Sequence, residues 1–214
     1  MARRGNPRAT IYVIAGTNGA GKSSLAGSMF RARGATTFDP DDATQRILAA
    51  NPTLALERAN SLAWHQGVRL LQKAIREAKS YAIETTLGGS TITGLLHSAL
   101  DERREVRILY VGLEGPDLHV SRVRARVRAG GHDVPEARVR DRYRRSLENL
   151  VGLLPRLTEL RVFDNSAERE PAKGIAPEPR LILHTSAGKI RTLCRLQDVP
   201  AWAKPIVAAA LREG

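Results

Sequence analysis

Short apolar runs alternate with longer amphipathic stretches along most of the chain. The runs Thr10 to Ala15, Arg107 to Leu113 and Leu160 to Phe163 are rich in β-branched and aliphatic residues, which is typical of strands buried on both faces of a parallel sheet. Shorter runs at Ala35 to Phe38 and Tyr81 to Ile83 predict two further strands. We therefore expect a parallel sheet of about five strands.

The stretches between these runs carry apolar residues at helical spacing. Ser23 to Arg33, closed by Gly34, and the long stretch Thr53 to Lys79 predict two helices. Apolar residues available for a packed face of the long helix are Leu54, Ala55, Leu62, Val68, Leu71 and Ile75. Pro116 to Ala129 predicts a third helix, which Gly130 and Gly131 end. A fourth helix opens at Pro135, with one stripe formed by Val139, Tyr143, Leu147, Leu150 and Leu154.

The chain changes character after the last predicted core strand. Ala167 to Pro179 is rich in Pro, Glu and Lys, which is typical of a linker. Beyond it, Leu181 to His184 and Ile190 to Cys194 flank a turn and predict a hairpin, and Ala201 to Arg212 predicts a closing helix. Residues 167–214 are therefore expected to pack as a hairpin and helix on the domain that precedes them.

Composition narrows the class of protein. A chain of 214 residues suits one α/β domain with small additions. No stretch approaches the roughly 20 apolar residues that span a bilayer, so we expect a cytoplasmic protein without a membrane partner. The single cysteine, Cys194, excludes an internal disulfide framework.

The charge is strongly positive and locally concentrated. The formal net charge is +12, which favours anionic partners such as nucleotides, sugar phosphates or nucleic acid. Between Arg122 and Arg145 lie nine arginines and the acidic residues Asp133, Glu136 and Asp141, a local charge of +6. Half of the net charge thus belongs to one segment.

A phosphate-binding loop follows the first predicted strand. Gly16 to Ser23 fits the G-x-x-x-x-G-K-[ST] pattern in full, between a strand and a helix as the motif requires. Glycines let backbone N–H groups point at phosphate oxygens, Lys22 is expected at the β and γ phosphates of ATP, and the Ser23 hydroxyl is expected to bind Mg²⁺. The expected ATP-binding residues are Gly16, Thr17, Asn18, Gly19, Ala20, Gly21, Lys22, Ser23 and Ser24.

This motif within alternating strands and helices predicts an α/β P-loop NTPase fold with a kinase-type parallel sheet. We expect residues 1–166 to form the kinase domain, with an Arg-rich lid at about residues 116–145. The chain has no LSGGQ-like segment and no N-K-x-D motif, which argues against an ABC-type ATPase and a GTPase. A kinase additionally needs a carboxylate for the acceptor hydroxyl and cations for the transferring phosphoryl group.

Acidic residues follow two of the predicted strands. Asp41 lies just beyond the second strand, where a carboxylate can receive a hydroxyl proton or hold a metal. Its neighbours Asp39 and Asp42 have an alternative role as helix caps, which fits Asp42 better than Asp41. Glu84 ends the third strand and is followed by Thr85 and Thr86, expected substrate contacts, although a salt-bridged carboxylate at a strand end is the alternative.

The arginine segment is expected to close over the phosphates. On a helix, Arg122 and Arg126 share one face, whereas Arg124 and Arg128 lie about 200° away. A helix charged on two sides is hard to bury against a sheet but suits a lid. Guanidinium groups form bidentate contacts with phosphate oxygens. His132, in the Gly-Gly-His hinge, is expected to be a structural or substrate-contact residue.

Several motifs in order resemble the zeta toxin family of P-loop kinases, particularly its compact bacterial branch often labelled "predicted ABC-type ATPase". The likeness covers roughly Ile11 to Asn165, through the segments GTNGAGKSS, FDPDD, AIETTLGG, RVRARVRAGGHDVP and RDRYRRSLENL. Characterised members phosphorylate the 3′-hydroxyl of the sugar in UDP-N-acetylglucosamine with ATP and Mg²⁺. The resemblance therefore implies a sugar-nucleotide kinase, with an antitoxin protein as a partner.

The resemblance also implies roles by position. Lys22 and Ser23 match the Walker A residues, Asp41 matches the catalytic base, and Glu84 matches the acidic substrate contact. The two phosphate-contacting arginines of the family fall within Arg122 to His132. Arg126 and Arg122 are favoured as catalytic residues, with His132 or Arg128 as alternatives for the second. The linker and terminal hairpin depart from the well-studied toxins.

Two alternatives to a sugar-nucleotide kinase stay open. The first is a kinase acting on nucleic acid or on another small metabolite. The net charge of +12 favours nucleic acid, although few aromatic residues are available for base stacking. A nucleotide-gated module of a toxin–antitoxin pair is the non-enzymatic alternative. It predicts ATP binding without a phosphorylated product.

Overall fold

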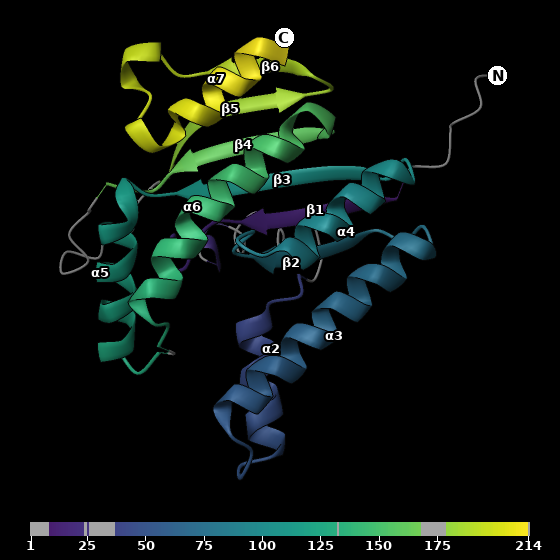
Figure 1. Ribbon diagram of the computed structural model, residues 1–214, viewed down its shortest axis with the longest axis vertical. Coiled ribbons are helices and arrows are strands. Elements are labelled where there is room, and N and C mark those ends of the chain that lie inside the picture. The colour runs from purple at the N-terminus through teal and green to yellow at the C-terminus, as the bar shows by residue number, and fades with distance from the viewer. Residues whose placement is uncertain (1–8, 24, 26–36, 132, 168–178, 214) are drawn as a thin grey trace.

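The computed structural model of the chain describes residues 9–23, 25, 37–131, 133–167 and 179–213 (Figure 1). The helices are α2 (Pro40–Ala50), α3 (Leu56–Arg76), α4 (Ser90–Asp101), α5 (Gly115–Arg128), α6 (Glu136–Leu153) and α7 (Lys204–Glu213), with short 3-10 helices η1 (Leu154–Arg156), η3 (Leu196–Asp198) and η4 (Ala201–Ala203). The strands are β1 (Thr10–Ala15), β2 (Tyr81–Thr85), β3 (Glu105–Gly112), β4 (Glu159–Asp164), β5 (Arg180–Ser186) and β6 (Lys189–Leu193).

Within the described residues, six strands form one sheet in the order β2-β1-β3-β4-β5-β6. Strands β1 to β4 pair in parallel, whereas β5 is antiparallel to β4 and β6 is antiparallel to β5. Strand β1 lies between β2 and β3 and is buried along most of its length. This position explains why its sequence is a run of apolar residues. The carboxyl ends of β1, β3 and β4 consequently share one edge, toward the left in Figure 1.

The predicted strands are largely confirmed. The four runs that begin at Thr10, Tyr81, Arg107 and Leu160 correspond to β1, β2, β3 and β4, and the predicted terminal hairpin is β5 and β6. In the run from Ala35 to Phe38, residues 35 and 36 lie outside the described residues, and Phe38 forms a parallel bridge to Ile83 of β2. The sheet is therefore bordered beyond β2 by this segment. The predicted helix from Ser23 to Arg33 lies mostly outside the described residues.

Helices α4, α6 and α7 cover one face of the sheet (Figure 1). Their buried side chains include Leu96 of α4, Leu150 of α6 and Ile206 of α7, which pack in one core with Ile108 of β3. The other face holds a smaller cluster that contains Ile14, Leu109, Val111 and Leu113. This burial on both faces is what a parallel sheet requires.

Helix α4 was not predicted from the sequence. Its first turns contain Thr91, Ile92, Thr93 and Gly94, residues of weak helix propensity that follow a glycine pair. The helix is stabilised instead by tertiary packing, because Ile92, Leu96 and Ala99 are buried against the sheet.

Helix α3 confirms the predicted helix but only part of its predicted packed face. Val68, Leu71 and Ile75 are buried, whereas Leu62 is 37% exposed and was wrongly placed on that face. The small residues Ala59, Ala63 and Gly67 are buried in its place. The amino-terminal half of α3 extends away from the sheet and lies beside α2 (Figure 1). Small side chains on this half of α3 permit the two helices to approach closely.

Helices α5 and α6 occupy the segment predicted as a lid, and they pack on each other. Val120 and Val123 of α5 pack with Val134 and with Val139 of α6 in a separate apolar cluster. The basic helix α5 thus buries a narrow valine stripe against a neighbouring helix and leaves its charged positions at the surface.

The C-terminal segment packs over the carboxyl end of β3. Trp202 is 4% exposed, its Nε1 donates to Asp164 Oδ1 at 3.1 Å, and its ring lies over Gly112. A Cβ atom at residue 112 would lie 2.4 Å from the Trp202 ring. Residue 112 is therefore glycine because the Trp202 ring leaves no room for a side chain, and not because of a turn.

Replacement of Gly112 by alanine should destabilise the protein. We expect Gly112→Ala to lower the free energy of unfolding by about 1–3 kcal/mol, because the methyl group forces the buried indole to move. Denaturant unfolding followed by circular dichroism measures the change. Gly152→Ala in α6 is the matched control, since no atom lies within 4 Å of its added Cβ. Equal stability of both variants and the parent would contradict this account of the Trp202 contact.

Candidate active site

The phosphate-binding loop curls at the carboxyl end of β1. Gly16 and Gly21 have φ values of +144° and +86°, in the region that favours glycine. A Cβ atom would lie 2.1 Å from the Val111 carbonyl oxygen at the first position and 2.5 Å from Asn165 Nδ2 at the second. The loop is thus held tightly against β3 and the segment after β4, in the conformation that directs N–H groups toward an anion.

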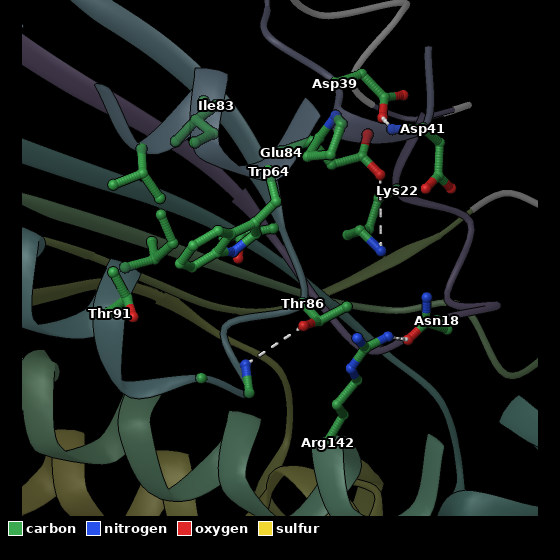
Figure 2. Close-up of a pocket in the computed structure, with 17 residues that line it drawn as sticks. Asn18, Lys22, Asp39, Asp41, Trp64, Ile83, Glu84, Thr86, Thr91 and Arg142 are labelled. Atoms are coloured by element: carbon green, nitrogen blue, oxygen red, sulfur yellow. Dashed lines mark hydrogen bonds and ion pairs between the residues drawn. The ribbon is translucent and has the colours of Figure 1, made fainter. Parts of the chain in front are cut away.

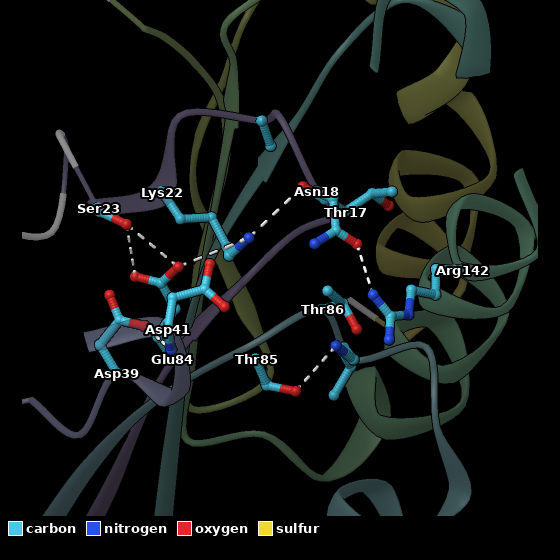
Figure 3. Close-up of polar contacts among 12 residues, drawn as sticks. Thr17, Asn18, Lys22, Ser23, Asp39, Asp41, Glu84, Thr85, Thr86 and Arg142 are labelled. Atoms are coloured by element: carbon cyan, nitrogen blue, oxygen red, sulfur yellow. Dashed lines mark hydrogen bonds and ion pairs between the residues drawn. The ribbon is translucent and has the colours of Figure 1, made fainter. Parts of the chain in front are cut away.

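Lys22 and Ser23 both converge on Glu84 (Figure 3). The Lys22 side chain is buried, with Nζ at 3.5 Å from the Thr17 carbonyl oxygen and 3.7 Å from Glu84 Oε1. Ser23 Oγ donates to Glu84 Oε2 at 3.1 Å. Burial raises the pKa of Glu84 and the neighbouring ammonium of Lys22 opposes this shift. The loop and the end of β2 therefore form a single polar site, as expected from adjacent parallel strands.

The acidic segment before α2 lies beside this site. Asp39 caps α2, since its Oδ1 accepts from the Asp41 N–H at 2.9 Å, and burial raises the pKa of Asp39. The alternative role of a helix cap, considered for both Asp39 and Asp42, is therefore confirmed for Asp39 and wrong for Asp42, because α2 begins at Pro40 and Asp42 instead pairs with Arg46 one turn later. Asp41 lies in the first turn of α2, and its side chain is 61% exposed.

The two favoured lid arginines lie at different parts of the site. Arg126 Nη1 is 3.7 Å from Asp41 Oδ2, so this arginine lies beside the candidate base. Arg122 Nη2 donates to the Asn165 carbonyl oxygen at 2.8 Å, and Asn165 Nδ2 in turn donates to the Ala20 carbonyl oxygen at 2.9 Å. Arg122 thereby connects α5 to the back of the phosphate-binding loop.

The remaining predicted site residues are placed as follows. Thr85 and Thr86 follow Glu84 at the same pocket. Arg128 lines a separate groove between α5 and α6 that also contains Val127 and Asp133. Ser24 and His132 lie outside the described residues.

Arg142 is a site residue that the sequence analysis did not single out. Its Nη1 donates to the Asn18 side-chain oxygen at 2.9 Å, and burial lowers the pKa of this guanidinium (Figure 3). Arginine nevertheless stays charged at neutral pH. A signal was present, because Arg142, Ser146 and Asn149 form a polar stripe on one face of a helix that is otherwise apolar toward the sheet.

His119 of α5 contacts the same loop residue. Its Nδ1 lies 2.9 Å from the Asn18 carbonyl oxygen, and burial lowers the pKa of His119 to about 4. The neutral ring therefore donates from Nδ1 to this carbonyl group at neutral pH. Both lid helices are thus anchored on Asn18, one through the backbone and one through the side chain.

A pocket of about 280 Å³ opens next to Lys22 (Figure 2). Polar residues on its wall are Asn18, Lys22, Asp39, Asp41, Glu84, Thr85, Thr86, Thr91 and Arg142. Apolar residues on its wall are Pro40, Trp64, Val68, Ile83 and Ile92. The pocket therefore combines a hydrogen-bonding side near the phosphate-binding loop with an apolar side formed by α3, β2 and α4.

The oxygen-bearing side chains at this site are of the kind that Mg²⁺ uses as ligands in proteins. Across the described ranges, no three His, Cys, Asp or Glu side chains come together as a metal-binding group. Mg²⁺ is commonly bound by one or two protein oxygens together with substrate phosphates and water. The Ser23 hydroxyl and the adjacent Glu84 carboxylate fit that pattern.

Among the helices that the structure describes, none combines the length and apolar character needed to cross a bilayer.

Comparison with known proteins gives a family match and distant structural matches. The family model described as AAA domain matches residues 11–150. An uncharacterized protein of Haemophilus influenzae is 31% identical over 128 residues, which cover 60% of this chain and 88% of that protein. The family match spans the loop, the acidic segment, β2, α5 and most of α6.

Solved structures with low sequence identity share the fold. A chain of the AvrRxo1-ORF1:-ORF2 complex crystallised with ATP aligns with a TM-score of 0.66 at 13% identity, over 95% of this chain and 64% of that one. A chain from the PezAT chromosomal toxin–antitoxin system of Streptococcus pneumoniae aligns with a TM-score of 0.54 at 12% identity, over 97% and 86%. The predicted α/β P-loop NTPase fold is confirmed, with two antiparallel strands added to the parallel sheet.

Proposed function

Because this chain belongs to the AAA domain family of P-loop proteins, we propose that it is an ATP-dependent kinase that phosphorylates a hydroxyl group of a small molecule. One observation carries the proposal: the phosphate-binding Lys22 opens onto a pocket whose nearest walls bear the carboxylates of Asp41 and Glu84. A pure nucleotide switch has no need of a second pocket lined with hydrogen-bond acceptors.

The donor side consists of the loop from Gly16 to Ser23. Its backbone N–H groups and the Lys22 ammonium would bind the phosphates of ATP, while Ser23 would hold Mg²⁺. Mg²⁺ would neutralise charge on the phosphates and orient them. Lys22 and Ser23 both contact the Glu84 carboxylate in this structure. When ATP and Mg²⁺ bind, Lys22 would exchange this contact for the phosphates, and Ser23 would exchange it for the metal.

On the acceptor side, Asp41 is the proposed general base. The acceptor hydroxyl attacks the γ-phosphorus, its proton passes to the Asp41 carboxylate, and ADP leaves. The exposure of Asp41 and its long contact with Arg126 support this role, because a loosely paired carboxylate can turn toward a bound hydroxyl. Glu84, Thr85 and Thr86 are proposed to bind the remainder of the acceptor.

Cations from the lid would stabilise charge on the transferring group. Arg126, which approaches Asp41, and Arg142, which approaches Asn18, both face the space in front of the loop. Guanidinium groups at such a position lower the barrier of phosphoryl transfer by preorganised electrostatic attraction. We propose both as phosphate contacts, with Arg122 acting from the back of the loop.

We propose a sugar nucleotide such as UDP-N-acetylglucosamine as the acceptor, on the basis of the zeta toxin motifs, and an antitoxin as a partner protein. The name of the PezAT toxin–antitoxin system supports the antitoxin partner by analogy. An acceptor of small-molecule size is also supported by the lid, where Arg124, Arg140 and Arg144 each pair with a carboxylate. These pairs reduce the positive charge that a nucleic acid would require.

Mass spectrometry of reaction products tests the proposal directly. The protein is incubated with ATP, Mg²⁺ and UDP-N-acetylglucosamine, with other metabolites and a short RNA in parallel, and Lys22→Ala as the control. We expect one phosphoryl group to be added to the sugar nucleotide and to be absent in the control. A phosphorylated RNA would favour the nucleic-acid alternative. ATP binding without any phosphorylated acceptor would contradict a kinase and favour the nucleotide-gated module.

A further inference from the structure

Trp64 continues a core stripe of α3 past the point where the core ends. Trp64, Val68, Leu71 and Ile75 share one face at intervals of four, three and four residues. The last three are buried against the sheet, whereas Trp64 is 42% exposed. Its position on the stripe is that of a buried residue, but the amino-terminal half of α3 extends away from the sheet (Figure 1).

The indole of Trp64 faces the pocket beside Lys22 (Figure 2). Val68, Ile83 and Ile92 complete the apolar side of this pocket. An aromatic side chain that is left half exposed at the wall of a pocket gains the most free energy when a ligand covers it, because aromatic rings bury large areas.

The opposite side of the pocket specifies what kind of ligand fits. Asp39, Asp41 and Glu84 offer carboxylate oxygens, which accept hydrogen bonds when ionised. Thr85, Thr86 and Thr91 add hydroxyl groups. The carboxylates and hydroxyls of this side therefore suit a group rich in hydrogen-bond donors, while Lys22 and Arg142 beside them suit the transferring phosphoryl group.

We propose that Trp64 is the stacking platform for one uncharged, hydroxylated ring of the acceptor, a saccharide ring whose apolar face covers the indole and whose hydroxyls reach the carboxylates. This inference rests on the proposed kinase function. A sugar ring has both surfaces that the pocket demands, an apolar face and a rim of hydroxyl donors. A nucleobase also stacks on tryptophan, but it carries its few N–H donors on part of its edge, whereas the hydroxyls of a sugar surround the ring and can reach all three carboxylates.

The size of the pocket sets a limit on what enters. Its volume of about 280 Å³ lies at the small end of ligand sites, which range from about 300 to 1,000 Å³ for drug-sized molecules. One substituted ring would occupy much of this space, so the diphosphate and base of a sugar nucleotide would extend beyond the residues that line the pocket.

Steady-state kinetics of Trp64 variants test the platform in the full chain, with whichever acceptor the product analysis identifies. Trp64→Ala should raise the KM for the acceptor by about thirtyfold, the effect of removing a central aromatic contact, and leave the KM for ATP within about twofold. Trp64→Phe should restore most of the affinity because it keeps an aromatic face. Leu70→Ala is the matched control, since Leu70 is also exposed on α3 but outside the pocket.

Fluorescence quenching tests the same contact without turnover. The chain has two tryptophans, and Trp202 is 4% exposed, so acrylamide quenches Trp64 selectively. Free monosaccharides, including N-acetylglucosamine, should protect Trp64 from quenching, and UMP should not. Protection by UMP alone, or an unchanged acceptor KM in Trp64→Ala, would overturn the platform. Protection by a sugar in a protein that phosphorylates no acceptor would support the platform and reject the kinase proposal.

Discussion

Lys22→Ala should severely impair phosphoryl transfer while leaving the protein folded. The Lys22 side chain is buried at the mouth of the pocket, where its ammonium contacts Glu84 and the Thr17 carbonyl group. Its ammonium is therefore available to the β and γ phosphates. Removing one preorganised charge of this kind costs about 100- to 1,000-fold in kcat. Release of ADP and phosphorylated product, measured together, quantifies the loss.

Two further variants separate chemistry from folding. Lys22→Met keeps the length of the buried side chain without its charge, so it should lose activity to the same extent with less effect on packing. Lys73→Ala removes a lysine whose side chain is 59% exposed near the end of α3, and it should retain full activity. Circular dichroism and denaturant unfolding establish that each variant is folded. Turnover by folded Lys22→Met within tenfold of the parent would exclude Lys22 as a phosphate ligand of the reaction.

The parts of the fold that were predicted are those that local patterns specify. Strand β1 was predicted from the largely apolar run Thr10 to Ala15 together with the loop motif, because this motif is preceded by a buried strand. The hairpin of β5 and β6 was predicted from its turn. Helix α4 was missed because it is stabilised by the sheet it covers, and the sequence of Ser90 to Asp101 carries a weak helix signal on its own.

The same distinction applies to the site. Lys22, Asp41 and Glu84 could be proposed from the sequence because each follows a predicted strand, and parallel strands end at one edge. Trp64 and Arg142 come from the middle of helices, and their approach to this edge depends on how α3 and α6 cross it. Helix orientation is determined by packing between distant residues, which a single sequence does not reveal.

The charged groups of the site pair with one another. Lys22 contacts Glu84, and Arg126 contacts Asp41. Each pair joins a group proposed for the phosphates to a group proposed for the acceptor, so binding of both substrates would replace two internal contacts with four external ones. Opening and closing of the proposed lid would cost little free energy at this contact, because both side chains of the Arg126–Asp41 pair are more than one-third exposed and exposed pairs contribute about 0–1 kcal/mol.

Asp41→Asn should lower kcat by about 100- to 10,000-fold, the usual contribution of a general base, and leave ATP binding intact. The amide has the shape of the carboxylate but cannot take the proton of the acceptor hydroxyl. The fold should be unaffected, since the side chain is 61% exposed and contributes one long ion pair with Arg126. Rapid-quench measurement of the first turnover would place the defect in the chemical step.

Asp42→Asn provides an unusually close control. Asp42 is the adjacent residue in the first turn of α2, its side chain is also 61% exposed, and it too pairs with one arginine, Arg46. The two variants therefore remove the same charge from the same helix end and differ only in whether the carboxylate lines the pocket. Because macrodipole and net-charge effects are shared, Asp42→Asn should keep kcat within about twofold of the parent. Equal losses in the two variants would assign the effect to α2 as a whole and remove Asp41 as the base.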